Sequence, residues 1–300
     1  MNKTKIIEDL RQVVDELAKI MFDIYVEWYA SLRSPLTESE RMAINMYRMM
    51  VFKAKSIGLM SQGIVIIPTQ KSIIPDPSTI YPVLRSMYEL LFLFRCIFVS
   101  SKNDKERELL CKLWAIRGNN NLIGIPNEEL DEKNRSKKKN KKAENRMLRI
   151  EIRELMHQFV LSPSVIDKIE KSINNNSPIL KGFKFEHCDN CDNIIDFTEL
   201  NFSNVSLGKA FSGASYIYSH YSAHSHPSFI GVKHFEEMYY DKDEYIFMKE
   251  ILEYTYIYLG RFMTDFCKYK DSYHPFYNQE ESNINNILTR IMQIQQNAEL

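Results

Sequence analysis

The sequence contains few residues that form tight turns, with nine glycines and ten prolines among 300 residues. This scarcity argues against turn-rich β-sandwiches and glycine-rich dinucleotide-binding loops, and it favours long helices. An excess of either charge is also missing, because 39 Lys and Arg residues balance 39 Asp and Glu residues. A neutral chain has no overall attraction for nucleic acid or membranes, so any such attraction has to come from a local cluster of charges.

Signals for secretion and for membrane insertion are also missing. The first residues, MNKTKIIEDLRQVVDEL, are charged and amphipathic, unlike a secretory leader. The longest apolar run, LLFLFRCIFVS at 90–100, is too short to span a bilayer and contains Arg95, so we interpret it as a buried helix. The five cysteines are an odd number. Together these features predict a cytoplasmic protein with reduced thiols and no membrane contact.

Apolar residues recur at steps of three and four along most of the chain, which is typical of amphipathic helices. Thr37 is a candidate N-cap, because Glu38 and Glu40 follow it at the positive end of the next helix. We expect no strand. The expected helices cover residues 5–33, 38–66, about 79–100, 103–118, 164–173, 197–225, 235–269 and 280–297.

The predicted fold is an all-α helical bundle of about eight helices, with a charged insertion between two core halves. The expected parts are an N-terminal helix (1–39), a first core half (40–125), a charged helical arm with an irregular loop (126–196) and a second core half (197–300). The arm contains the basic run EKNRSKKKNKKAENR. Such a run is usually a solvated helix or a mobile linker, and the alternative is a contact with a phosphate backbone.

The segment HCDNCD, at 187–192, places Cys188 and Cys191 at the spacing of half a zinc site. Closed structural zinc sites need four ligands, and no second CxxC pair follows. We therefore expect an exposed loop with two incidental cysteines, and we predict neither a metal nor another cofactor. Zinc at this pair is the weaker alternative.

The segment YSHYSAHSHPSF, at 218–229, holds three of the seven histidines. His220 and His224 are four residues apart, so they share a helix face and could together hold a metal. A helical zinc protease carries Glu after the first histidine, however, and here that residue is Tyr221. His226 precedes Pro227 and should therefore lie at the helix end, where a capping histidine is the structural alternative.

The segment YPVLRSMYELLFLF, at 81–94, contains Arg85 and Glu89 on the most apolar helix of the chain. Buried charges are costly unless they are matched. One interpretation is an ion pair within the helix that fixes packing. The other is a functional pair, in which Arg85 binds a phosphate and Glu89 orients a histidine or the same arginine.

These segments resemble DUF5677, a bacterial all-helical family of unknown function. DPSTIYPVLRSMYELLFLF is similar to its R-S-x-x-E segment, with Arg85, Ser86 and Glu89 at the motif positions. YSHYSAHSHPS is similar to its Y-x-x-x-S-x-x-x-H-[GP]-S segment. FKAKSIGLM, around Lys55 and Ser56, resembles the preceding helix, so the resemblance covers about 40–270. The residues that match the second motif are Tyr218, Ser222, His226 and Ser228, which leaves His220 and His224 outside it.

That family is in turn similar to the HEPN group, many of whose members are metal-independent ribonucleases of toxin and anti-phage systems. The resemblance implies a helical core, RNA as substrate, a homodimer and a partner protein of a defence system. The usual HEPN pattern of Arg, four to six residues and His is missing before His226, and the candidate arginine is Arg85 on another helix.

The chemistry assigns the residues as follows. Arg85 and Glu89 are candidate catalytic residues together with Ser222 and His226, in which imidazole acts as base or acid and the guanidinium steadies the phosphate. The candidate substrate-binding residues are Tyr218, His220, His224 and Ser228. The alternative is a non-catalytic module that binds a partner or a nucleotide, with Arg85, Glu89 and His226 as a structural polar network.

Overall fold

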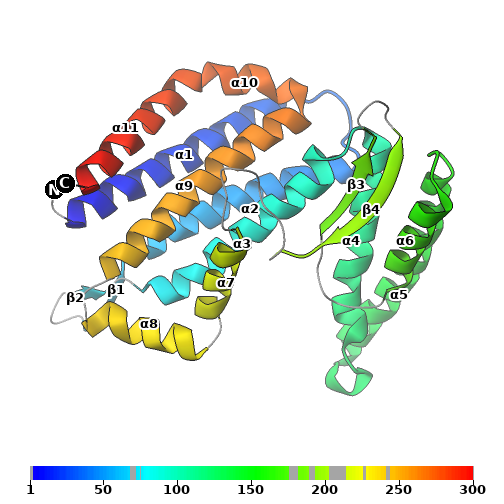
Figure 1. Cartoon of the computed structure of the whole chain (residues 1–300), viewed down its shortest axis with the longest axis horizontal. Coiled ribbons are helices and arrows are strands. Elements are labelled where there is room, and N and C mark those ends of the chain that lie inside the picture. The colour runs from blue at the N-terminus through cyan, green and yellow to red at the C-terminus, as the bar shows by residue number, and fades with distance from the viewer. Residues whose placement is uncertain are drawn as a thin grey trace. The chain divides into compact units, whose positions relative to one another are not determined.

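A computed structural model describes residues 3–67, 72–74, 76–175, 182–188, 193–202, 214–225, 228–240 and 244–299. The described residues form eleven α-helices and two antiparallel β-hairpins (Figure 1). The helices are α1 (Lys3–Ser31), α2 (Glu38–Met60), α3 (Pro77–Phe94), α4 (Asp104–Gly124), α5 (Glu132–Met156), α6 (Pro163–Asn174), α7 (Ala214–Ser225), α8 (Phe229–Tyr240), α9 (Glu244–Tyr269), α10 (His274–Gln279) and α11 (Glu281–Glu299). The strands are β1 (Ile64–Ile67), β2 (Ser72–Ile74), β3 (Gly182–His187) and β4 (Ile194–Leu200).

The all-α class is confirmed, because helices dominate the described residues. The expected number of about eight helices is wrong. The basic run forms the regular helix α5, and the segment expected as one helix over 235–269 belongs to two, α8 and α9. The short α10 was also not expected. Among the described helices, none is both long enough and apolar enough to cross a bilayer.

Contacts between residues divide the chain into two compact units. The first comprises Met1–Leu91 and Ala210–Leu300, and the second comprises Phe92–Lys209. The boundary falls within α3, and α4 therefore groups with the charged segment that follows it.

The first unit is built around α1, which contacts α2, α9, α10 and α11 (Figure 1). Its apolar residues recur every three or four positions and are buried along the whole helix, from Ile6 to Trp28. The ring of Trp28 meets Phe266 of α9 edge-on, with 5.4 Å between ring centroids. Nearby, the buried hydroxyl of Tyr47 lies 2.6 Å from that of Tyr273, which satisfies two polar groups inside an apolar core.

Helix α2 begins with a reciprocal cap and ends at Met60, with Ser61 as its C-cap, before a glycine with positive φ. The Glu40 amide donates to Thr37 Oγ1 over 3.2 Å, and the Thr37 amide donates to Glu40 Oε2 over 2.8 Å, so the expected N-cap is confirmed. Gly63 has a φ of 86°, a conformation that side chains disfavour. The chain then enters β1, so the expectation of helix to residue 66 is wrong. The β-branched sequence of Ile64–Ile67 suits the strand.

The second unit places the β3–β4 hairpin against helices, with β4 on α6 and β3 on α4. Phe185 pairs with Phe197 across the hairpin, and both side chains are buried. A Cβ atom on Gly182 would lie 2.7 Å from the ring of Phe92 and 2.9 Å from Cys96 Sγ, so only glycine fits there without a shift. The sequence predicted an irregular loop before residue 197 and a helix from residue 197 onward. Both predictions are wrong for the residues that form β3 and β4.

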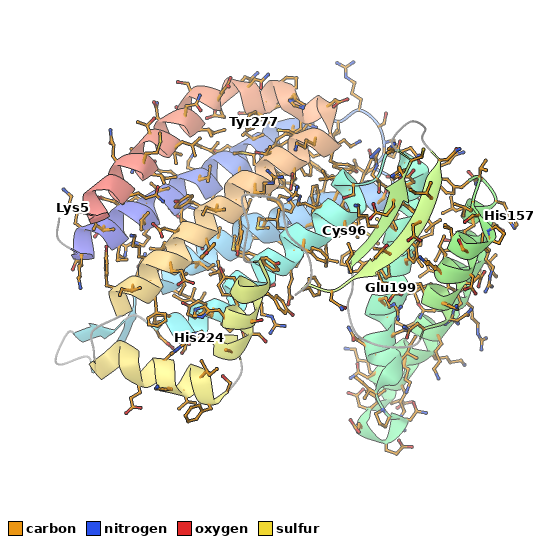
Figure 2. All side chains as sticks on the ribbon, in the orientation of Figure 1. Lys5, Cys96, His157, Glu199, His224 and Tyr277 are labelled. Atoms are coloured by element: carbon orange, nitrogen blue, oxygen red, sulfur yellow. The ribbon has the colours of Figure 1, made fainter. Side chains whose placement is uncertain are left out.

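A buried cation joins the hairpin to α4. Arg117 on α4 is 1% exposed, and its Nη2 donates to Glu199 Oε1 of β4 over 2.6 Å. Figure 2 labels Glu199. Its Nη1 donates to the Asn175 carbonyl over 3.0 Å, while its Nε is buried without a hydrogen-bond partner. A buried guanidinium needs this anion nearby, because desolvation of an unmatched charge is costly.

We predict that Glu199→Ala lowers the free energy of unfolding by about 3 kcal/mol, because it leaves the Arg117 guanidinium buried and unmatched. Urea denaturation would measure the change. Asp196→Ala on the same strand is the matched control. It removes an exposed ion pair with Lys168 and should cost less than about 1 kcal/mol. Equal losses in the two variants would contradict the role given to Glu199.

Candidate functional site

Two of the sequence motifs meet around the guanidinium of Arg85 in the first unit. Arg85 Nε donates to Glu89 Oε1, one turn along α3, over 2.9 Å. Tyr218 and Ser222 of α7 accept from the same guanidinium, with 2.7 Å from Nη2 to the Tyr218 hydroxyl and 3.4 Å from Nη1 to Ser222 Oγ. The Tyr218 hydroxyl also donates to Glu89 Oε1 over 3.3 Å. We call these four residues the Arg85 cluster.

The Arg85 cluster is partly open to solvent. The side chains of Arg85 and Glu89 are 20% and 27% exposed. The guanidinium carbon lies 4.8 Å from the centroid of the Tyr218 ring, a distance typical of a cation–π contact. Burial raises the pKa of Tyr218, and the charge of Glu89 raises it further, while Arg85 opposes the rise. The hydroxyl therefore stays protonated at neutral pH and can donate to the carboxylate.

A second cation, Lys53 on α2, was missed by sequence reasoning. Burial lowers the pKa of Lys53, and its electrostatic interaction with Glu89 partly offsets that effect. The resemblance drew attention to Lys55 and Ser56 instead. Lys55 pairs with Asp15 of α1, and Ser56 donates to a backbone carbonyl of its own helix. The available signal was the position of Lys53 three residues after the buried Met50 and next to the buried Ala54 on α2.

Helix α7 carries polar residues on both sides of one buried side chain. Tyr221 is 0% exposed, and its hydroxyl lies 3.1 Å from that of Tyr258 on α9. Successive helical residues are about 100° apart. Tyr218 and Ser222 therefore lie on one flank of Tyr221, and His220 and His224 lie on the other. The histidines predicted to bind the substrate thus lie on a different flank from the Arg85 cluster.

Three histidines meet on that second flank. His220 and His224 belong to α7 and His234 to α8, and one ring nitrogen of each lies within 4.8 Å of the other two. His224 Nε2 and His234 Nδ1 are 3.1 Å apart. The ring centroids of His220 and His224 are separated by 4.5 Å. We call these residues the histidine cluster, and Figure 2 labels His224 between α7 and α8.

Two members of the histidine cluster, His220 and His224, have pKa values shifted toward the neutral ring. His224 is 7% exposed. Burial, together with the charges that His220 and His234 would carry, lowers the pKa of His224 to about 4. Burial and then His234 also lower the pKa of His220. Nδ1 of His224 is buried without a hydrogen-bond partner, which typically costs about 1–3 kcal/mol.

Two further residues border the histidine cluster. His220 Nε2 lies 3.3 Å from the hydroxyl of Tyr81 on α3 and 3.7 Å from Glu250 Oε1 on α9. The ring of Tyr81 stacks on that of His224, with 4.5 Å between centroids. Burial raises the pKa of Glu250 to about 7, and Glu253 adds to the rise. Glu250 can therefore accept or donate a proton near neutrality.

The remaining predicted residues are placed as follows. His226 lies outside the described residues, and so does Cys191. Ser228 directly precedes α8, where its Oγ accepts from the Gly231 amide over 2.9 Å and donates to the Ala223 carbonyl over 2.8 Å. The side chain of Cys188 has intermediate exposure. Its neighbour His187 lies 3.1 Å from Glu106 Oε1 on α4, so that ring has a partner in the fold.

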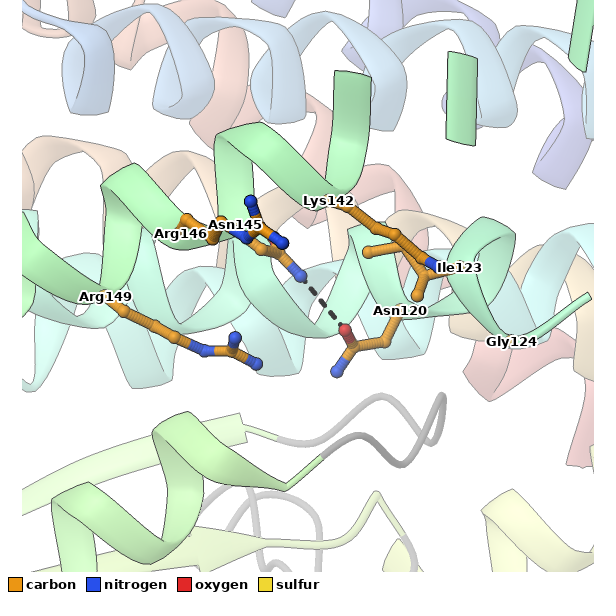
Figure 3. A pocket seen from close by; sticks show the side chains of 7 residues that line it. All are labelled: Asn120, Ile123, Gly124, Lys142, Asn145, Arg146 and Arg149. Carbon is orange, nitrogen blue, oxygen red and sulfur yellow. Dashed lines mark hydrogen bonds between the residues drawn. The ribbon is translucent and has the colours of Figure 1, made fainter. Parts of the chain in front are cut away.

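A basic hollow lies between α4 and α5 in the second unit. Figure 3 shows Lys142, Arg146 and Arg149 around it, on the same helix as the basic run. Asn145 Nδ2 donates to Asn120 Oδ1 over 3.0 Å on its wall. The hollow has a volume of about 390 Å³. Three cations around an open hollow can attract a phosphate by charge alone.

No family model matches the chain, and neither a curated protein nor a solved structure is similar enough to match it. The resemblance to DUF5677 and to the HEPN group therefore stays a prediction from short motifs.

We predict that Tyr218→Phe lowers the free energy of unfolding by about 1 kcal/mol, since the hydroxyl has partners in both Arg85 and Glu89. Combined with Arg85→Gln, the loss should be smaller than the sum of the single losses by about 0.5 kcal/mol or more, because the residues share hydrogen bonds. Chemical denaturation of the four proteins gives this coupling. Tyr29→Phe, at an exposed tyrosine of the same unit, is the control and should change little. Strictly additive losses would argue against the cluster.

Proposed function

We propose that the chain is a HEPN-like, metal-independent RNA-cleaving effector of a bacterial anti-phage or toxin-type system, and that the Arg85 cluster binds the phosphate to be cut. One observation supports this above all. Arg85 and Tyr218 are 133 positions apart in the sequence and share a 2.7 Å hydrogen bond at a partly exposed surface. A phosphate needs a fixed guanidinium with room beside it, and Arg85 is held from two helices.

In the proposed reaction, the 2′-oxygen of the RNA attacks phosphorus and the bond from phosphorus to the 5′-oxygen breaks. A base takes the 2′-hydroxyl proton, and an acid protonates the departing 5′-oxygen. His226 would serve as base or acid. Arg85 would stabilise the charge that builds on the phosphate oxygens, and Glu89 would orient Arg85 through their 2.9 Å hydrogen bond. Tyr218 and Ser222 would position the substrate.

Basic residues of the second unit give the proposal separate support. Helix α5 carries the lysine-rich run, and Lys142, Arg146 and Arg149 border the hollow of Figure 3. Contacts to phosphate need no base recognition, so this surface would bring RNA near by charge. The homodimer and the partner protein that the resemblance implies stay predictions.

A non-catalytic role is the second candidate, and one observation favours it. Each nitrogen of the Arg85 guanidinium already donates to a neighbouring side chain of the protein, namely Glu89, Tyr218 or Ser222. If the role is non-catalytic, the network fixes how α7 packs on α3, and the function is partner or nucleotide binding.

The test uses the purified chain and a labelled single-stranded RNA, beside the same strand with 2′-deoxy nucleotides. We expect cleavage of the RNA alone, and cleavage that persists in EDTA. Arg85→Ala and His226→Ala should each slow it by about 100-fold or more, the loss typical of removing a charge-stabilising donor or an acid–base group. Gel electrophoresis of the products measures the rate.

His157→Asn, at an exposed histidine of the second unit, is the matched control and should cut RNA at the wild-type rate. Circular dichroism establishes that each variant is folded, and Arg85→Lys replaces Arg85→Ala if the alanine variant does not fold. Wild-type rates in folded Arg85 and His226 variants would remove these residues from the reaction and leave the structural network. Equal cleavage of the deoxy strand would overturn the proposed attack by the 2′-oxygen.

A further inference from the structure

The histidine cluster has the composition of a transition-metal site. Three imidazoles from α7 and α8 each offer one ring nitrogen, and these nitrogens all lie within 4.8 Å of one another. Ligand atoms on a tetrahedral zinc ion are roughly 3.4 Å apart, given bonds of about 2.1 Å. His224 Nε2 and His234 Nδ1 are already 3.1 Å apart, so small side-chain rotations would bring the third ring into place.

The protein alone leaves the polar groups of this cluster poorly matched. His224 is more than nine-tenths buried, and its Nδ1 has no hydrogen-bond partner there. The contact between His224 and His234 sets two ring nitrogens against each other, so one of them has to carry a proton to make a hydrogen bond. A cation would attract the lone pairs of both nitrogens and remove this conflict.

We infer that His220, His224 and His234 bind one transition-metal ion of the zinc class. Nitrogen donors suit Zn²⁺, Cu²⁺, Ni²⁺ or Co²⁺ rather than Ca²⁺ or Mg²⁺, which prefer oxygen ligands. Three histidines leave the fourth position of a tetrahedral ion open. The side chain of His220 is 14% exposed and that of His234 is partly exposed, so the cluster is not sealed from solvent.

Tyr81 and Glu250 are positioned as outer partners of the ligands, since both lie near His220 Nε2. Partners of this kind orient metal-bound histidines. The ion would join α7 to α8, which makes its role structural and separate from the proposed RNA chemistry at the Arg85 cluster. The site would therefore stabilise the fold whether or not the chain cuts RNA.

The test titrates the full chain, stripped with EDTA and dialysed, with Zn²⁺ alone against a chromophoric chelator. We expect one tightly bound ion per chain and a higher melting temperature when it is bound. His234→Asn and His220→Asn should each weaken binding by about tenfold or more, since mutating even a residue that only hydrogen-bonds to a metal ligand lowers metal affinity by that much. His274→Asn, an exposed histidine of the same unit, is the matched control and should bind as the wild type does.

Co²⁺ distinguishes this site from the Cys188 and Cys191 pair. Cobalt bound to thiolate gives an intense near-ultraviolet charge-transfer band, and cobalt bound to imidazole alone does not. We expect no such band, and unchanged binding in the Cys188→Ser, Cys191→Ser double variant. An ion that is lost in the cysteine variant, or retained at full affinity in folded His234→Asn and His220→Asn proteins, would overturn the assignment.

Discussion

A guanidinium held between two helices is the interaction on which the candidate site depends. Arg85 projects from α3 and is fixed by Glu89 on its own helix and by Tyr218 and Ser222 on α7. The charge of the carboxylate and the two hydroxyl oxygens offset the desolvation of a side chain that is only 20% exposed. Without this cation, the two hydroxyls of α7 and the Glu89 carboxylate of α3 would have no shared donor, and the motif residues would have no common centre.

Much of this site could be anticipated from the sequence, because local spacing determines helix faces. Arg85 and Glu89 are one turn apart, as are Tyr218 and Ser222, and each pair shares a face for that reason. Only two of the three residues of the histidine cluster could be anticipated from the sequence. His220 and His224 share a face by the same rule, whereas His234 comes from the next helix, beyond Pro227. No spacing rule predicts how α8 turns back on α7, because that contact depends on tertiary packing.

The missed strands have a different cause. The segment GFKFEH alternates apolar and polar residues from Phe183 to Glu186, and IIDFTEL carries the β-branched residues that suit a strand. The signal was therefore present, but it was short and lay beside cysteines and asparagines that suggest a loop. Conversely, the basic run is helical although its mean composition is highly polar. The apolar residues that follow the run in the same helix, including Leu148, Ile152 and Leu155, are buried, and α5 packs on α4.

The anchoring of Tyr221 links the two flanks of α7. Its ring is fully enclosed and its hydroxyl is matched to Tyr258, so the helix resists rolling about its long axis. Any rotation that improved the seating of Tyr218 against Arg85 would shift His220 and His224 by the same angle. The orientation of this one helix therefore sets the positions of both polar clusters together.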